Sequence, residues 1–153
     1  MSIAARHKKP GGFRNLVNSL ETTPLPRREQ LMAILRNDDP QFLAHVETAI
    51  FMFEEFKSVN GMMVAELMHE MKNEMTAVAL ALYHCSDEEL VQKFVKNMAS
   101  AQAFAYRDTA SELAQVTVGQ QTGARFRIIE KARELQQQGR ILLKKYSPLY
   151  QDD

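Results

Sequence analysis

Apolar residues recur three and four positions apart along most of the chain, which is the spacing of helices with one buried face. No segment shows the two-residue alternation typical of a strand. The first helical segment is Phe13–Leu20, and Pro24 and Pro26 break the chain after it. The buried positions expected in the next helix are Leu31, Met32, Ile34 and Leu35. The pattern therefore predicts an all-α protein.

Asp39 and Pro40 mark the start of a third helix, because aspartate is a good N-cap and proline suits the first helical position. The apolar stripe continues without a gap, so one helical pattern is expected to run through the aromatic segment Ile50–Phe53. A turn is predicted at Lys57–Gly61. The predicted stripe consists of Phe42, Leu43, Val46, Ala49, Ile50 and Phe53.

The second half of the chain predicts several short helices. Met62–Met71 is one, and Asn73–Tyr83 is apolar nearly all round, which places it in the centre of a bundle. Ser86 and Glu89 have the spacing of a capping box, so the next helix is expected to start there. The residues that it is expected to bury are Leu90, Val91, Phe94, Val95 and Met98.

An alanine-rich helix is predicted from about Ala99 to Ala114, and a long final helix from about Ala124 to Gln138. Val116–Gly123 is interpreted as a break or a short turn between them, and Gly139 as the C-terminal capping signal. Ile141–Leu143 is then expected to fold back on the bundle.

These elements predict four parts in sequence order. They are a flexible arm at residues 1–12, linker helices at 13–49, a main helical domain at 50–146 and a polar tail at 147–153. Short helices with brief connections favour an armadillo-like superhelical stack with a C-terminal helical bundle. Periodicity alone also fits an up-down bundle.

Composition limits the classes of function. With 153 residues and 45% apolar residues, the chain is long enough for one domain or two small helical layers. Nineteen basic and nineteen acidic residues cancel, so no global charge indicates a nucleic acid or a membrane. Cys85 is the single cysteine, which favours a reducing compartment. Because Met1–Gly12 does not resemble a secretory signal and no apolar run approaches roughly 18 residues, a cytoplasmic protein is expected.

Candidate catalytic and metal-binding residues are few. His84 and Cys85 are adjacent soft ligands, but a zinc site takes about four ligands and no second pair has suitable spacing. A nucleophilic Cys85 would need a histidine brought close by the fold. The carboxylate pairs Asp38–Asp39 and Glu54–Glu55 are neighbours in sequence, and such neighbours point to different faces of a helix. The sequence therefore predicts no enzyme, no metal and no cofactor.

Two surfaces remain open to interpretation. Methionines crowd one region, where filling of the core is favoured over a partner-binding groove; they are Met52, Met62, Met63, Met68, Met71 and Met75. Basic residues crowd the end of the chain beside only Glu130 and Glu134; they are Arg125, Arg127, Lys131, Arg133, Arg140, Lys144 and Lys145. These cations fit either a phosphate-binding face or helix C-termini, and no nucleic acid is expected because no aromatic residues are interleaved with them.

Several motifs together resemble the C-terminal half of the FliG family of bacterial flagellar motor switch proteins. They are Asp39–Pro40, Ile50–Glu55, Glu70–Lys72, Val78–Leu82, Glu88–Ala99 and Ala132–Gly139. Their order and spacing match the family from about Gly12 to Leu143. The resemblance implies an armadillo-like, non-enzymatic component of the motor's switch ring, at the cytoplasmic face of the inner membrane in the flagellar basal body and peripheral to that membrane at most. It implies flagellar switch or stator proteins, and further copies of the chain in a ring, as partners.

The resemblance also assigns roles to residues of this chain. It implies a switching hinge at Ile50, Phe51, Met52 and Phe53 and a charged ridge that faces the stator. The ridge candidates are Lys93, Lys96, Arg107 and Asp108. Several charges of the family's ridge are replaced here; the positions are Tyr83 or His84, Ala101, Thr109 and Gln115–Val118.

Three hypotheses follow from this resemblance and from the basic residues. The first is a rotor component that couples to stator or switch proteins. The second is a diverged adaptor or scaffold that binds protein partners through the methionine-rich region without transmitting torque. The third is a nucleic-acid binder that uses Arg125–Lys145.

Overall fold

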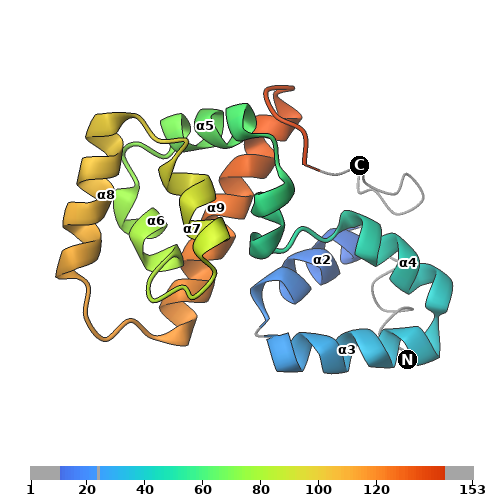
Figure 1. Cartoon of the computed structure of the whole chain (residues 1–153). Helices are drawn as coiled ribbons and strands as arrows, with labels where there is room; N and C mark the ends of the chain where they lie inside the picture. The colour runs from blue at the N-terminus through green and yellow to red at the C-terminus, as the bar shows by residue number, and fades with distance from the viewer. Residues whose placement is uncertain (1–10, 24, 144–153) are drawn as a thin grey trace. The chain divides into compact units, whose positions relative to one another are not determined.

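The computed structural model describes residues 11–23 and 25–143, which form helices joined by short connections, with no strand among them (Figure 1). The all-α prediction is therefore confirmed. The described chain divides into a first unit, which ends at Phe51, and a second unit, Met52–Leu143. The predicted tail at residues 147–153 and most of the predicted arm at 1–12 lie outside the described residues.

The first unit contains α2 (Gly12–Thr22), α3 (Leu25–Asp38) and α4 (Pro40–Ala49). Both α2 and α3 pack on α4, and the ring edge of Phe13 meets Phe42 with 6.1 Å between centroids. As predicted, Asp39 caps α4, since its carboxylate accepts a hydrogen bond from the Phe42 amide at 3.1 Å.

The predicted buried face of α3 is largely wrong. Leu35 is buried, but Leu31 and Met32 are only half-buried and Ile34 is 47% exposed. Successive residues of an α-helix point about 100° apart. With Leu35 facing the core, its neighbour Ile34 consequently faces away from it.

The predicted helical run from Asp39 through Phe53 is also wrong. Helix α4 ends at Ala49, Ile50 is extended (φ −61°, ψ 135°), and a 3₁₀ helix, η1, spans Phe53–Ser58, so it overlaps the predicted turn at Lys57–Gly61. The Phe51 amide donates to the carboxylate of Glu21 at 2.5 Å, and the Met52 amide to that of Glu55 at 2.6 Å. Side chains thus satisfy the two amides that a longer helix would have bonded to its own carbonyls.

The second unit is built from η1 and five α-helices. They are α5 (Gly61–Glu70), α6 (Met75–Ala81), α7 (Glu88–Val95), α8 (Ser100–Glu112) and α9 (Val118–Gln137). Helix α6 packs against both α8 and α9, which confirms the central place predicted for the apolar segment around it (Figure 1). Helix α5 packs on α7 and α9, and η1 packs on the same two helices.

Helix α7 begins one residue later than predicted. Its N-cap is Asp87 rather than Ser86, because the Asp87 carboxylate accepts a hydrogen bond from the Leu90 amide at 3.3 Å. Leu90 and Phe94, four residues apart, are buried as predicted. The other three expected core positions, Val91, Val95 and Met98, are only half-buried.

Helix α9 begins at Val118, so the predicted break at Val116–Gly123 is wrong over most of its length. Thr117 and Gln120 form a reciprocal capping box with bonds of 3.1 and 2.9 Å, and the helix continues through both of its glycines. Gly139 (φ +74°) ends the helix as predicted. Its amide donates to the Gln136 carbonyl and that of Arg140 to the Leu135 carbonyl, each at 2.9 Å, which is the Schellman pattern.

Among the described residues, no helix has both the length and the apolar character needed to cross a bilayer.

Candidate functional site

The predicted hinge residues are divided between the two units. Ile50 and Phe51 close the first unit, where both are buried, at 4% and 3% exposed. The carboxylate that holds the Phe51 amide belongs to Glu21, which is itself only 7% exposed. Burial of this carboxylate makes its hydrogen bonds strong contributors, since an unmet buried acceptor is costly.

Met52 and Phe53 open the second unit. The ring of Phe53 stacks on Phe94 with centroids 5.2 Å apart and planes at 9°. Phe56 meets both rings edge-on, with centroid distances of 5.5 Å to Phe53 and 5.2 Å to Phe94. We call Phe53, Phe56 and Phe94 the aromatic trio. It fixes η1 to α7, so Phe53 is a core residue of the second unit.

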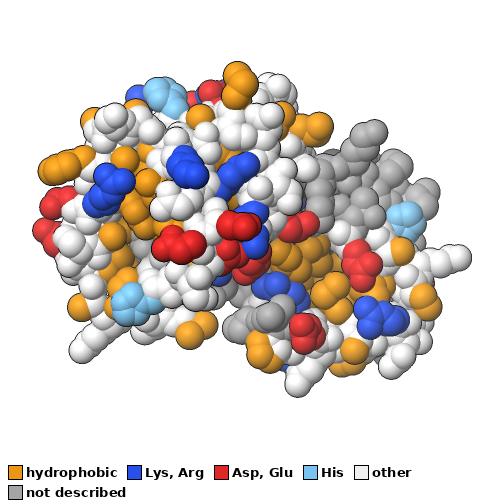
Figure 2. Space-filling model, viewed as in Figure 1, with side chains coloured by type: hydrophobic (Ala, Val, Ile, Leu, Met, Phe, Trp, Pro, Cys, Tyr) orange, Lys and Arg blue, Asp and Glu red, His pale blue; other side chains and the backbone are white. Residues whose placement is uncertain are grey.

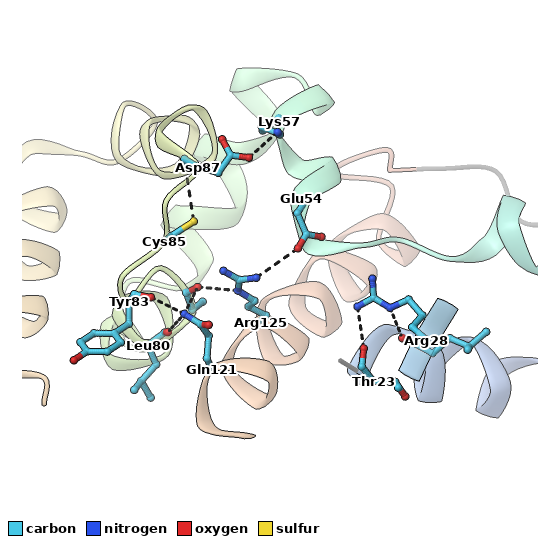
Figure 3. Close-up of polar contacts among 12 residues, drawn as sticks. Thr23, Arg28, Glu54, Lys57, Leu80, Tyr83, Cys85, Asp87, Gln121 and Arg125 are labelled. Carbon is cyan, nitrogen blue, oxygen red and sulfur yellow. Dashed lines mark hydrogen bonds and ion pairs between the residues drawn. The ribbon is translucent and has the colours of Figure 1, made fainter. Parts of the chain in front are cut away.

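Arg125 of α9 meets the start of η1 and the end of α6 (Figure 3). Its Nε donates to the Ala81 carbonyl at 2.9 Å, and one terminal nitrogen lies 3.5 Å from the Glu54 carboxylate. The guanidinium carbon is 4.8 Å from the centroid of the Phe53 ring. No sequence pattern identified this arrangement, because its members are far apart along the chain.

A second link joins η1 to α7. The Lys57 ammonium lies 2.7 Å from the Asp87 carboxylate, the group that also caps α7 (Figure 3). The hydrogen bond from Lys57 holds the pKa of Asp87 below its ordinary value, and the same bond raises the pKa of Lys57. Both side chains are about one-third exposed, so the link is a surface pair of modest strength.

The four predicted ridge residues lie on α7, at its C-cap and on α8. Lys93 is on α7 and Lys96 is its C-cap, and both line a hollow of about 540 Å³ together with Glu88, Glu89, Gln92 and Asn97. Arg107 and Asp108 are both exposed on α8. Within residues 11–23 and 25–143, none of these four charged groups has an ion pair or a side-chain hydrogen bond. Figure 2 shows basic and acidic side chains interspersed over the face of the second unit that it presents.

Helix α8 also exposes an aromatic ring that the sequence analysis did not single out. Phe104 is 73% exposed, and it precedes Arg107 and Asp108 by three and four residues, which places all three on one side of the helix. Ala103 is the buried residue of this helix. The signal in the sequence was a phenylalanine in a helix of otherwise small or polar residues.

The basic residues of α9 and of the segment after it are largely paired with carboxylates. Arg127 lies 2.8 Å from Glu74 and 2.7 Å from Glu130, and Arg140 pairs with Glu66 and Glu70 of α5. The hydrogen bond from Arg127 lowers the pKa of Glu74. These pairs reduce the net positive charge that suggested a phosphate-binding face. Lys144 and Lys145 lie outside the described residues.

The remaining candidates do not assemble into a reactive site. His84 has a positive φ of 48° and stacks on Tyr83 with 4.0 Å between ring centroids. In the part of the chain that the structure describes, no three His, Cys, Asp or Glu side chains come together to hold a metal. Met68 and Met71 are fully buried, whereas Met62 is 82% exposed, so core packing accounts for the first two.

Comparison with known proteins gives a consistent result. Residues 33–143 match the FliG C-terminal domain family. The flagellar motor switch protein FliG of Pseudomonas aeruginosa is 26% identical over 133 residues, which cover 87% of this chain and 38% of that protein. Two crystal structures of H. pylori FliG share the fold at 21% identity. Residues 86–343 give a TM-score of 0.60, covering 84% of this chain and 59% of that one, and residues 116–343 give 0.59, covering 88% and 58%.

Proposed function

The chain belongs to the FliG C-terminal domain family, and from this premise we propose that it is a non-enzymatic component of a flagellar motor switch. It spans 38% of the length of the curated relative, so the role of that whole protein is extended to this chain as a proposal. The proposed partners are flagellar switch or stator proteins and further copies of the chain in a ring. The proposed location is the cytoplasmic face of the inner membrane.

The observation that supports this function best is the set of unpaired charges on α7 and α8. Other cations of the second unit, such as Arg127 and Arg140, have carboxylate partners, whereas the four ridge residues have none among the described residues. A hydrated charge without an internal partner contributes little to stability. It remains available to attract or repel charged groups of a partner, which steers association.

The proposed hinge is the link between Phe51 and Met52. The amide of Phe51 is bonded within the first unit and that of Met52 within the second. Ile50 and Met52 both have extended backbone. The Ile50 amide donates to the Val46 carbonyl of α4, and the Met52 carbonyl accepts the Glu55 amide of η1, so each of these bonds stays within one unit and a rotation between Phe51 and Met52 need not break it. Hinges are short segments of this kind, in which a few residues absorb a change of φ and ψ.

A second candidate is an adaptor that keeps the fold without transmitting torque. Phe104 favours it, because an exposed aromatic ring beside charged residues is typical of protein-binding surfaces. The replacement of ridge charges at Ala101 and Thr109 also favours it, since fewer charges give weaker electrostatic coupling. Both candidates share the family, the fold and the absence of catalysis, and they differ in the role of the charges.

The deciding experiment measures swimming in the source organism. We expect a clean deletion to abolish motility, and Asp108→Lys to reduce swimming speed because it reverses one ridge charge. The matched control is Glu29→Lys, which also reverses one negative charge, at an exposed position of α3. Normal swimming of the deletion strain would refute the motor role. Loss of motility on deletion, with full motility in the Asp108→Lys strain, would favour the adaptor.

A further inference from the structure

Arg125 lies where three elements of the second unit meet. It starts from α9, donates to Ala81 in the last turn of α6 and pairs with Glu54 of η1 (Figure 3). Its guanidinium also lies over the ring of Phe53, the first residue of η1. Its side chain is 23% exposed, against 52% for that of Glu54. The guanidinium is thus more enclosed than its carboxylate partner, and three different contacts hold it in one orientation.

The position of the guanidinium follows from the end of α6. The last carbonyls of a helix have no partners within that helix, and they carry negative partial charge. Gln121 of α9 donates to the Leu80 carbonyl of α6 at 3.4 Å and to the Tyr83 carbonyl just beyond the helix at 2.7 Å, and Arg125 donates to the Ala81 carbonyl. Two side chains of α9 therefore satisfy the end of α6, and the positive charge of Arg125 suits this end electrostatically.

The contacts to η1 require an arginine. A guanidinium is flat, with N–H groups around its edge and two open faces. Here the edge serves the Ala81 carbonyl and the Glu54 carboxylate, while the group also lies over the Phe53 ring in a cation–π contact. A lysine ammonium is a single point charge on a flexible stem and does not reproduce this combination.

The aromatic trio and Arg125 attach η1 to different helices. The trio attaches η1 to α7, because Phe53 and Phe56 come from η1 and Phe94 comes from α7. Arg125 attaches the first residues of η1 to α6 and α9, which form the centre of the second unit. With both attachments in place, Phe53 and Glu54 are held from two sides.

We propose that Arg125 is a positioning residue that fastens the start of η1 to α6 and α9, so that bending of the proposed hinge is confined to the link between Phe51 and Met52. The inference rests on the proposed function, since it assigns a pivot to that hinge. Phe53, which the resemblance assigns to the hinge, then belongs to the rigid part of the second unit. Arg125 then determines which residues move when the hinge bends.

Hydrogen exchange of the purified full chain, followed by mass spectrometry, tests the proposal. In Arg125→Gln we expect the amides of residues 52–56 to exchange about five- to tenfold faster, because loss of the clamp frees the start of η1. The informative amide is that of Glu55, which donates to the Met52 carbonyl at 2.9 Å. Amides within α7 and α8 should keep their rates, whereas a general loss of stability would accelerate them as well.

Three further variants sharpen the test. Arg127→Gln is the matched control, since it removes the same charge from the same helix but contacts Glu74 and Glu130 rather than η1. Arg127→Gln should leave the exchange rates of the amides of residues 52–56 unchanged. Arg125→Lys keeps the charge and should accelerate the same amides to a smaller degree. If Arg125→Gln fails to fold, Arg125→Lys and Glu54→Gln provide the test, because the Glu54 side chain is half exposed.

Unchanged exchange at residues 52–56 in the Arg125 variants would overturn the proposal, as would equal acceleration across the whole second unit. The measurement needs no motor, so its outcome is independent of the swimming experiment. Faster exchange at η1 together with normal swimming of the deletion strain would support the clamp and refute the motor role. Unchanged exchange at residues 52–56 together with loss of swimming in the deletion strain would refute the clamp and support the motor role.

Discussion

Replacement of Phe94 by alanine should destabilise the second unit severely. The ring is fully buried, stacks on Phe53 and meets Phe56 at its edge, each with 5.2 Å between centroids. Truncation of a buried phenylalanine to alanine costs about 3–5 kcal/mol. Loss of two aromatic contacts places this site in the upper half of that range, so we expect a loss of about 4 kcal/mol.

The assay is urea unfolding followed by circular dichroism, with Phe104→Ala as the matched control. The control removes the same atoms from a ring of the same unit, but that ring is 73% exposed. Its effect on the free energy of unfolding should stay within about 0.5 kcal/mol. For a domain of this size, Phe94→Ala should also lower the melting temperature by more than about 12 °C.

A loss below about 1 kcal/mol in Phe94→Ala would refute the reasoning, since it is less than the lower end of the range for buried rings. So would equal losses in the two variants. Either result would mean that the aromatic trio does not hold η1 on α7. The attachment of η1 would then depend more on Arg125 at its start and on the Lys57–Asp87 pair near its end.

Three further predictions concern local features. Gly139→Ala should destabilise the chain by about 1 kcal/mol because φ is +74°, whereas Gly123→Ala inside α9 should stabilise it, as thermal unfolding would show. Asp39→Ala should cost about 1 kcal/mol in urea unfolding through loss of the α4 cap, while exposed Asp38→Ala should have little effect. The lowered pKa of Glu74 means that its pair with Arg127 stabilises the fold above pH 4.5 and is lost as the pH falls below that value. Glu74→Gln should therefore cost ~0.5 kcal/mol at pH 7, and less when unfolding is measured at pH 3.

Local signals predicted much of the fold. The all-round apolar character of the segment Met75–Leu82 was enough to place α6 in the centre of the second unit. Asp39 and Gly139 are capping residues whose geometry depends on neighbours within a few positions. Such features are predictable because the residues that make them are adjacent in the sequence.

The end of α4 was not predictable from periodicity. Ile50 and Phe53 continue the apolar stripe of α4 in sequence, but each is buried in a different unit. The helix ends where the carboxylate of Glu21, thirty residues away, accepts the Phe51 amide. An apolar pattern records that residues are buried and does not record which core buries them.

The start of α9 was predictable but was missed. Thr117 and Gln120 have the spacing of a capping box. Gly119 and Gly123 both fall within the segment interpreted as a break. A glycine inside a helix costs only about 1 kcal/mol, which the cap and the buried face of a long helix offset.

The candidate site was only partly accessible to sequence reasoning. Sequence position indicates which residues are charged, but pairing decides which charges are available to a partner. Arg127 meets Glu74 across 53 residues, and Arg140 meets Glu66 across 74. These distant partners change the interpretation of Arg127 and Arg140. Arg107 and Asp108 have no such partner among the described residues, so their charges stay available to a partner protein.

Membership of the family and a role in the motor depend on different residues of this chain. Likeness of fold requires that buried positions such as Phe94 and Val78 stay apolar and close in size. Coupling to a charged partner depends on exposed positions such as Asp108, whose replacement leaves the core unchanged. The fold can therefore persist after coupling is lost, which is why the charge reversal at Asp108 distinguishes a torque-bearing switch component from an adaptor and a core substitution does not.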